Sequence, residues 1–236
     1  MTLTKHARRL AAAAVLAVSA WATAANADEL AWLDALNVAW DSPSQGSFGS
    51  MPLGNGDVGL NVWVEPTGDL VFYIGKVDAF DANHLLPKLG RVRLRLEPAL
   101  STNAFRQALV LRDGAVEIKA DDVRLTVWVD ADSPVVRVQG TCAAPRSAVL
   151  AAESLRPLSD ANAAPPGSGT AGVLFADSAD RLAWCYRNQS SAWANNLKSQ
   201  NTPEWVAKAH DPILHRTPAA CSGGRVLSAR HPPPCG

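Results

Sequence analysis

The sequence is poor in the residues on which metal centres and nucleic-acid grooves depend. It has four cysteines in 236 residues, and their spacing matches no metal-ligand pattern. Its charges are interspersed and sum to zero, so we expect no nucleic-acid partner and no basic membrane face. His210 and His215 flank Asp211, but Pro212 interrupts any helical spacing between them. We therefore expect no metal and no cofactor. Pairing of Cys142 with Cys185 and two separate thiols are both compatible with the sequence.

Apolar runs long enough to anchor the chain in a membrane are also absent. The longest apolar run has the features of a signal peptide instead. Leu10–Ala24 is too short to span a bilayer, follows three basic residues and precedes a small-x-small triplet at 25–27. Met1–Ala27 therefore reads as a cleavable signal peptide, with an apolar core helix as the alternative. We predict an exported bacterial protein, periplasmic or secreted, that begins near Asp28 and has no membrane partner.

Helical periodicity is scarce after residue 58, and short alternating runs replace it. In Arg91–Leu96, for example, Val92, Leu94 and Leu96 share one face and three arginines share the other. Such strands with short turns between them indicate an all-β fold, an antiparallel sandwich or barrel. The expected strands are Val58–Val64, Leu70–Ile74, Arg91–Leu96, Ala115–Lys119, Val123–Val129, Pro134–Val138, Ser147–Ala152, Val173–Phe175 and Leu182–Tyr186. Loops are expected over Asp41–Gly56 and Ala161–Gly172, and 191–208 is irregular.

The segment Gly54–Gly59 matches the glycine spacing of a dinucleotide-binding fingerprint. That motif needs a strand before it and a helix after it, so that the helix N-terminus faces the pyrophosphate. Here a β-branched run follows the glycines. We interpret them as a sharp turn into a strand and expect no nucleotide site.

Several long blocks of the sequence resemble one bacterial family, domain of unknown function 5703. The blocks are Trp40–Ser44, Gly49–Gly59, Trp63–Glu65, Tyr73–Asp81, Leu86–Val92, Trp128–Ala131, Pro134–Val135 and Asp211–Thr217. That family is similar to the N-terminal domain of glycoside hydrolase family 95, the α-L-fucosidase and α-galactosidase group. The resemblance implies a β-sandwich of the supersandwich type over residues 28–217. It also implies a following (α/α)6 barrel, which would hold the acid and base carboxylates.

The composition changes abruptly after Thr217. Residues 218–236 have no apolar periodicity and are rich in Pro, Gly, Arg and Cys. A shifted reading frame in a GC-rich gene would produce such a segment, and a disordered tail is the alternative. We therefore expect a sandwich that is incomplete at its C-terminus and separated from its own barrel domain.

Candidate site residues come from the resembling blocks, and none is assigned a catalytic role. Asn55, Asp57, Lys76 and Asp78 are predicted to form a rim that faces a sugar, because loops at strand ends carry function. An equally good interpretation is that they are polar groups fixing two loops. The carboxylates of Asp81 and Glu65 are expected to cap turns instead.

Tryptophan is the second source of candidates, because sugars stack on flat aromatic faces. Trp63 and Trp128 lie in apolar strands and are expected in the core. Trp193 and Trp205 lie in polar, irregular segments and are the predicted sugar-stacking residues.

These features predict a non-catalytic N-terminal domain of an exported, carbohydrate-active protein, whose partner is a glycan. Two alternatives remain open. A free-standing carbohydrate-binding module predicts a platform of exposed tryptophans. A small glycoside hydrolase requires its own pair of carboxylates, facing each other across the scissile bond.

Overall fold

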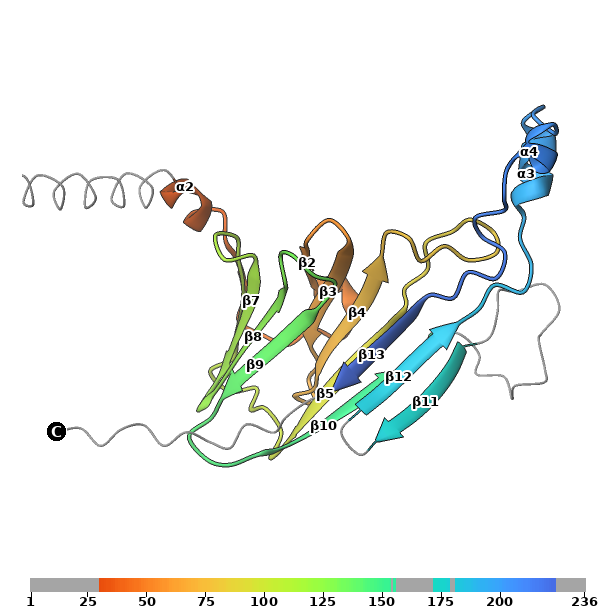
Figure 1. Cartoon of the computed structure of the whole chain (residues 1–236). Coiled ribbons are helices and arrows are strands. Elements are labelled where there is room, and N and C mark those ends of the chain that lie inside the picture. Colours follow the sequence, from red (N-terminus) through yellow and green to blue (C-terminus); the bar gives the residue numbers. More distant parts are fainter. Residues whose placement is uncertain (1–29, 154, 156–171, 179–180, 224–236) are drawn as a thin grey trace, which may run out of the picture.

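The computed structural model of the chain describes residues 30–153, 155, 172–178 and 181–223 (Figure 1). The predicted signal peptide and most of the predicted loop at 161–172 lie outside these residues. Within them the chain forms three antiparallel β-sheets with a few short helices, which confirms the all-β sandwich prediction. No helix in the described part of the chain has the length and apolarity needed to cross a membrane.

The two larger sheets have five strands each. Sheet A has the order β1 (Val38–Trp40), β6 (Arg106–Val110), β7 (Ala115–Ala120), β8 (Val123–Val129) and β9 (Val136–Thr141). Sheet B has the order β10 (Ser147–Glu153), β5 (Gly90–Glu97), β4 (Leu70–Lys76), β3 (Val58–Val64) and β2 (Met51–Gly54).

The smaller elements complete the fold. Sheet C has the order β11 (Gly172–Ser178), β12 (Arg181–Tyr186) and β13 (Ala219–Gly223). The helical elements are α2 (Ala31–Asp34), the 3-10 turn η1 (Ser47–Gly49), α3 (Trp193–Ser199) and α4 (Trp205–Lys208).

The core lies between the apolar faces of the sheets. Val62 of β3 and Val116 of β7 are completely buried, and both belong to one hydrophobic cluster. A buried polar contact also joins sheets A and B, because Gln107 Nε2 donates to the Val62 carbonyl oxygen at 3.2 Å. The strict alternation in β5 turns Val92 and Leu96 into this core, as predicted.

The opposite face of sheet B carries an ion-pair system, which we call the arginine network. Its members are Arg91, Arg93, Arg95, Glu65, Asp69 and Glu153. Arg93 is the centre, because its guanidinium lies 2.6 Å from a Glu65 oxygen, 2.6 Å from a Glu153 oxygen and 2.9 Å from an Asp69 oxygen. The predicted turn-capping role of Glu65 is wrong, because its carboxylate binds Arg93 instead.

Trp63 lies on this same face, where it is 1% exposed and contacts Tyr73 with ring centroids 5.1 Å apart. It is buried, as predicted, but outside the hydrophobic cluster between the sheets. Trp128 is half-buried and does not belong to the hydrophobic cluster, so the prediction that it lies in the core is wrong.

Sheet C packs beside sheet B through two aromatic side chains of β12 (Figure 1). Trp184 Nε1 donates to the Leu89 carbonyl oxygen at 3.0 Å, and Tyr186 Oη donates to the Ala79 carbonyl oxygen at 2.7 Å. The indole lies so close to Gly90 that a Cβ there would be 2.7 Å from Trp184 Nε1. Glycine at position 90 therefore makes room for the indole.

The structure also contains strands that the sequence pattern does not predict. β2 lies within the expected loop 41–56; it escapes detection because four residues with a proline are a weak pattern, although an edge strand tolerates proline. β1 and β6 are similarly short. β13 falls in the segment for which an irregular tail is expected, and its five residues pair with β12. Cys142, Cys185 and Cys221 are unpaired thiols.

Candidate functional site

Four charged side chains gather where β3 begins and β4 ends, and we call them the charged cluster: Asp57, Lys76, Asp78 and Arg216. The pairing of Val58 with Lys76 in the sheet fixes this position. Asp57 precedes Val58 in the β2–β3 turn, and its carbonyl oxygen accepts a hydrogen bond from Val77 N at 3.0 Å. Two rigid strands therefore place the three predicted residues Asp57, Lys76 and Asp78 side by side.

Lys76 lies at the centre of the charged cluster. Its Nζ donates to Asp57 Oδ1 at 2.9 Å and to Asp78 Oδ1 at 2.8 Å. The second oxygen of Asp78 accepts a hydrogen bond from Arg216 Nη2 at 3.2 Å. Two cations and two carboxylates thus form a chain of ion pairs, in which the side chains are between 27% and 50% exposed.

The electrostatics keep Lys76 and Asp78 ionised near neutral pH. Hydrogen bonding to Asp78 and then to Asp57 raises the pKa of Lys76, and this outweighs partial burial. The hydrogen bond from Lys76 lowers the pKa of Asp78, and Arg216 acts in the same direction. A carboxylate with a lowered pKa accepts hydrogen bonds well and is poorly suited to donate a proton.

The two carboxylates of the charged cluster are close enough to raise the question of hydrolysis. Because both bind one nitrogen, their Oδ1 atoms are at most about 6 Å apart, a bound that allows the spacing of retaining glycosidases but not that of inverting ones. The space between them, however, holds the Lys76 ammonium group instead of a sugar oxygen. The arrangement can donate and accept several hydrogen bonds, and the lowered pKa of Asp78 makes this carboxylate a poor proton donor.

Asn55 is the predicted site residue that the structure assigns to the scaffold. Its Oδ1 accepts hydrogen bonds from Asp57 N and Val58 N at 3.0 and 2.9 Å. Its Nδ2 donates to the carbonyl oxygens of Asp130 and Ser133 at 2.8 and 3.1 Å. Both amide protons and the oxygen are therefore used to join two loops, as in the alternative interpretation of this residue.

Arg216 is the member of the cluster that sequence reasoning missed, although it lies in a resembling block. Asn188, fully buried, holds its loop: Asn188 N donates to the Arg216 carbonyl oxygen at 2.9 Å, and Asn188 Nδ2 bonds the carbonyl oxygens of Phe80 and Ile213. No periodicity or motif signals a contact between residues 138 positions apart. Arg216 and Asp78 could be joined only in three dimensions.

Two aspartates shape the loops around the cluster. Asp81 Oδ1 accepts hydrogen bonds from Asn83 N and Leu85 N, which confirms its predicted turn-capping role. Asp211 Oδ1 accepts hydrogen bonds from Ile213 N and Leu214 N at 2.8 and 3.0 Å. Within the described residues, no group of three His, Cys, Asp or Glu side chains could hold a metal ion.

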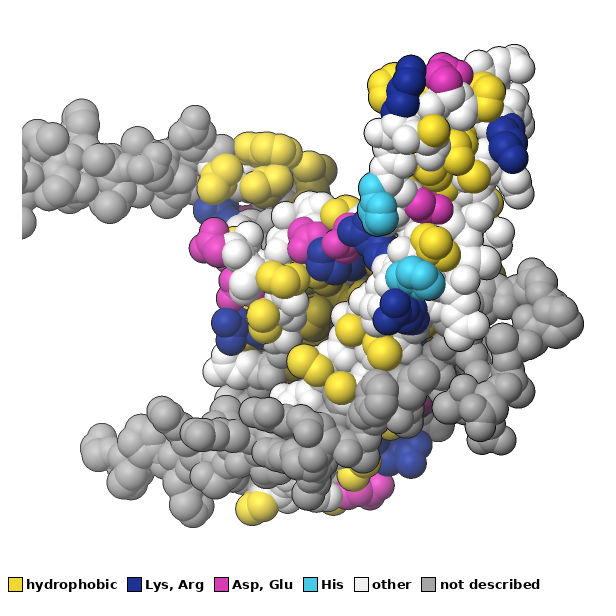
Figure 2. All heavy atoms as spheres, turned by 45° about the vertical axis from the view of Figure 1, so that its right-hand side comes forward, with side chains coloured by type: hydrophobic (Ala, Val, Ile, Leu, Met, Phe, Trp, Pro, Cys, Tyr) yellow, Lys and Arg dark blue, Asp and Glu magenta, His cyan; other side chains and the backbone are white. Residues whose placement is uncertain are grey.

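The two predicted sugar-stacking tryptophans lie on the helical projection formed by α3 and α4. Trp193 begins α3 and is half-buried, whereas Trp205 begins α4 and is 51% exposed. Lys208 Nζ lies 5.6 Å from the centre of the Trp205 ring, so a cation already occupies that face. Figure 2 shows hydrophobic and charged side chains mixed on the visible face of this projection.

Comparison with known proteins adds a family match that covers most of the chain. A family model described as Domain of unknown function (DUF5703), N-terminal, matches residues 39–231. This range includes every strand of the three sheets except the first residue of β1, and all four residues of the charged cluster. No curated protein matches the chain.

Proposed function

The chain belongs to the DUF5703 N-terminal domain family, and we propose that it is a non-catalytic, glycan-facing β-sandwich of an exported bacterial protein. Its proposed role is to pack against a catalytic barrel of the kind found in glycoside hydrolase family 95 and to extend the sugar pocket. The resemblance of the family's sequence blocks to the N-terminal domain of those hydrolases supports this proposal. The predicted signal peptide at Met1–Ala27 supports export.

The charged cluster is the observation that carries the proposal. Asp57, Lys76 and Asp78 present both donors and acceptors, and their ion pairs hold them in place before a ligand arrives. Sugar hydroxyl groups both donate and accept hydrogen bonds, so they match such a mixed array. The side chains remain partly exposed at the end of rigid strands, where a glycan or a barrel loop has access.

Asp78 of the cluster is poorly suited to be the acid of a hydrolase within this sandwich. Glycoside hydrolysis needs one carboxyl group that stays protonated near neutral pH, which requires a raised pKa. The pKa of Asp78 is lowered by its hydrogen bond to Lys76. We therefore propose binding, and not proton transfer, as the role of the cluster.

The first test measures turnover. The purified chain is incubated with 4-nitrophenyl α-L-fucoside and with the corresponding α-galactoside, and release of nitrophenol is followed. We expect no turnover. Hydrolysis that disappears in Asp57→Ala or Asp78→Ala would overturn the non-catalytic role and establish a small hydrolase instead.

The second test measures glycan contact. On a glycan array, we expect Lys76→Met to reduce the binding signal of the chain at least about fivefold. The substitution removes the ammonium group at the centre of the charged cluster and with it the hydrogen bonds to Asp57 and Asp78. Lys119→Met is the matched control, because Lys119 is also a strand lysine, 3.5 Å from a Glu117 oxygen, in sheet A. Equal signals from the two variants would contradict a glycan role for the cluster.

A further inference from the structure

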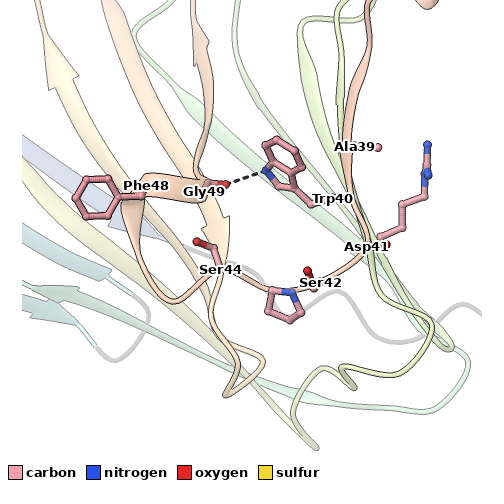
Figure 3. A pocket seen from close by; sticks show the side chains of 9 residues that line it. Ala39, Trp40, Asp41, Ser42, Ser44, Phe48 and Gly49 are labelled. Carbon is pink, nitrogen blue, oxygen red and sulfur yellow. Dashed lines mark hydrogen bonds between the residues drawn. The ribbon is translucent and has the colours of Figure 1, made fainter.

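A second concave site lies away from the charged cluster, at the end of β1. It is a pocket of about 530 Å³ lined by residues of β1, the following loop, η1 and the start of β6. Figure 3 shows the chain curving from Ala39 through Ser42 to Gly49, with Ser44 and Gly49 between the rings of Trp40 and Phe48. No residue of the charged cluster lines this pocket.

Two aromatic rings flank the pocket and remain open to solvent. Trp40 is 41% exposed, and Phe48 is completely exposed at the tip of η1. The Trp40 ring is nevertheless oriented, because its Nε1 donates to the Gly49 carbonyl oxygen at 3.0 Å. Its edge is thus bonded to the loop, which leaves the exposed part of the ring available for stacking.

The loop itself is held in shape without a ligand. Ser44 N donates to the Val64 carbonyl oxygen at 2.8 Å, and Ser44 Oγ donates to the Gly46 carbonyl oxygen at 2.6 Å. Gly49 packs so closely on this serine that a Cβ would lie 2.4 Å from Ser44 Oγ. A pocket with a fixed wall loses less conformational entropy when a ligand binds.

Polar side chains without a partner among the described residues line this pocket. Asp41, Ser42 and Arg106 line it, and in the described part of the chain their side chains make no hydrogen bond or ion pair. By contrast, the guanidinium groups of Arg93, Arg112 and Arg146 are all bound to carboxylates. A free carboxylate, a free hydroxyl and a free guanidinium therefore surround one oriented indole.

This combination matches the chemistry of a pyranose ring. The C–H face of the ring stacks on an aromatic plane, while its hydroxyl groups bind carboxylates and guanidinium groups around the rim. We propose that the Trp40 pocket is a glycan subsite that takes one pyranose unit, stacked on Trp40 and hydrogen-bonded by Asp41 and Arg106. The choice of ligand rests on the proposed function, whereas the site itself is separate from the charged cluster.

The experiment titrates the purified chain with methyl glycosides of fucose, galactose, glucose and glucuronic acid, and follows the indole N–H signals by NMR. The Trp40 signal is assigned with Trp40→Phe. We expect at least one glycoside to shift it in a saturable way. Because Trp40→Ala lacks this signal, titration calorimetry compares the affinities of the variants, and we expect Trp40→Ala to weaken the binding about tenfold or more. Trp32→Ala removes a tryptophan of α2 that is 60% exposed and does not line the pocket, and it should leave the affinity unchanged.

The polar groups have matched controls as well. We expect Arg106→Gln and Asp41→Asn each to weaken binding several-fold. Arg124→Gln and Asp132→Asn alter exposed side chains of sheet A and the β8–β9 turn that do not line the pocket, and should change nothing. If the chain prefers the glucuronide and Arg106→Gln removes this preference, the result would support an acidic sugar as the ligand. Equal binding of all four glycosides would support a neutral sugar.

Two outcomes would overturn the proposal: no saturable shift of the Trp40 signal with any glycoside, or equal affinities of Trp40→Ala and the unsubstituted chain. Unfolding curves of each variant establish that the fold is intact. The glycan array distinguishes failure of the Trp40 pocket proposal from failure of the proposed function. Binding lost in Lys76→Met but kept in Trp40→Ala supports the cluster alone, and the reverse pattern supports the pocket alone.

Discussion

Asp69 is the residue on which the arginine network depends most. It is 2% exposed and accepts hydrogen bonds from Arg93 and Arg95. The hydrogen bond from Arg95 lowers the pKa of Asp69, and Arg93 acts in the same direction against the effect of burial. Removing this carboxylate would leave Arg95 without its ion-pair partner and Arg93 with Glu65 and Glu153 alone.

We predict that Asp69→Asn lowers the free energy of unfolding by about 3 kcal/mol, because it breaks a buried ion pair. Urea denaturation at pH 7 measures the loss. Asp132→Asn, an exposed aspartate in the β8–β9 turn, is the control and should change stability by less than about 0.5 kcal/mol. A loss below about 1 kcal/mol for Asp69→Asn would contradict a central role for this residue.

The same side chain predicts a pH dependence. The folded-state pKa of Asp69 is below its ordinary value of 3.8, so its contribution is complete above that value. The contribution is lost as the pH falls through the lower folded-state pKa. Between about pH 5 and pH 2, stability should therefore fall less steeply in Asp69→Asn than in the unsubstituted chain. Parallel curves would contradict the lowered pKa.

At the scale of residues, sequence reasoning identified Asp57, Lys76 and Asp78 but not their partner Arg216. The first three share two paired strands, so a strand prediction is enough to bring them together. Arg216 reaches Asp78 only because Asn188 fixes its loop, and the burial of a single asparagine has no sequence signal. The sequence does not single out Trp40 among the tryptophans either, because its free face depends on a hydrogen bond to Gly49.

At the scale of elements, the β3–β4 turn shows how closely two backbones approach. Gly68 has φ +84°, and a Cβ there would lie 2.5 Å from the Leu100 carbonyl oxygen. Gly56 in the β2–β3 turn has φ +91°, but a Cβ at this position would meet no atom within 4 Å. The two glycines thus share a left-handed backbone and differ in the space around them.

We predict that Gly56→Ala lowers the free energy of unfolding by about 1 kcal/mol, the cost of a side chain in the left-handed region. Gly68→Ala should cost about 2 to 3 kcal/mol, because the collision with the Leu100 backbone adds to the same strain. Urea denaturation of the pair isolates the contribution of the close approach. Equal losses would show that the backbone near Leu100 moves away freely.

Sheet C gives a second prediction at this scale. Trp184→Ala removes the buried indole that bonds the Leu89 carbonyl oxygen, and should cost about 3 kcal/mol or more. Hydrogen exchange should accelerate in β12 and β13 more than in β6, β7 and β8. Trp205→Ala, on exposed α4, should leave exchange in sheet C unchanged. Equal acceleration in all sheets would show that sheet C is not attached separately.

Sequence patterns predicted the long strands well, because strands such as β5 and β8 bury one alternating face. They missed β2 and β13 for a physical reason: short strands at sheet edges derive their stability from the neighbouring strand, and their own residues are not strongly apolar. Met51 and Leu53 of β2 are buried, but Pro52 lies between them. In β13 the exposed and half-buried residues alternate without a fully buried one.

At the scale of the whole molecule, the proposed export gives a direct prediction. Expression in a bacterium with its signal peptidase should yield a mature chain that begins at Asp28. Mass spectrometry of the periplasmic fraction measures the new N-terminus. Ala27→Pro should block processing at this position and leave the precursor intact. A chain that retains Met1 in the periplasm would contradict the predicted cleavage.

The sandwich class followed from the number and spacing of strands, but the third sheet did not. Nothing in the alternation of β12 distinguishes a strand that extends sheet A from one that packs beside sheet B. Gly90 and Trp184 decide the arrangement, because only a residue without a Cβ leaves room for the indole. Such complementarity between distant positions becomes visible in three dimensions alone.

The arginine network has a consequence for how the molecule behaves among its own copies. Its three guanidinium groups and three carboxylates cancel locally, so this face of sheet B has little long-range field. The full sequence is also neutral, with an isoelectric point near 7.0. Colloidal repulsion is therefore weakest around neutral pH, where proteins of zero net charge tend to associate. Loss of the predicted basic signal segment would leave an excess of acidic groups, so a chain cleaved there should disperse better than its precursor.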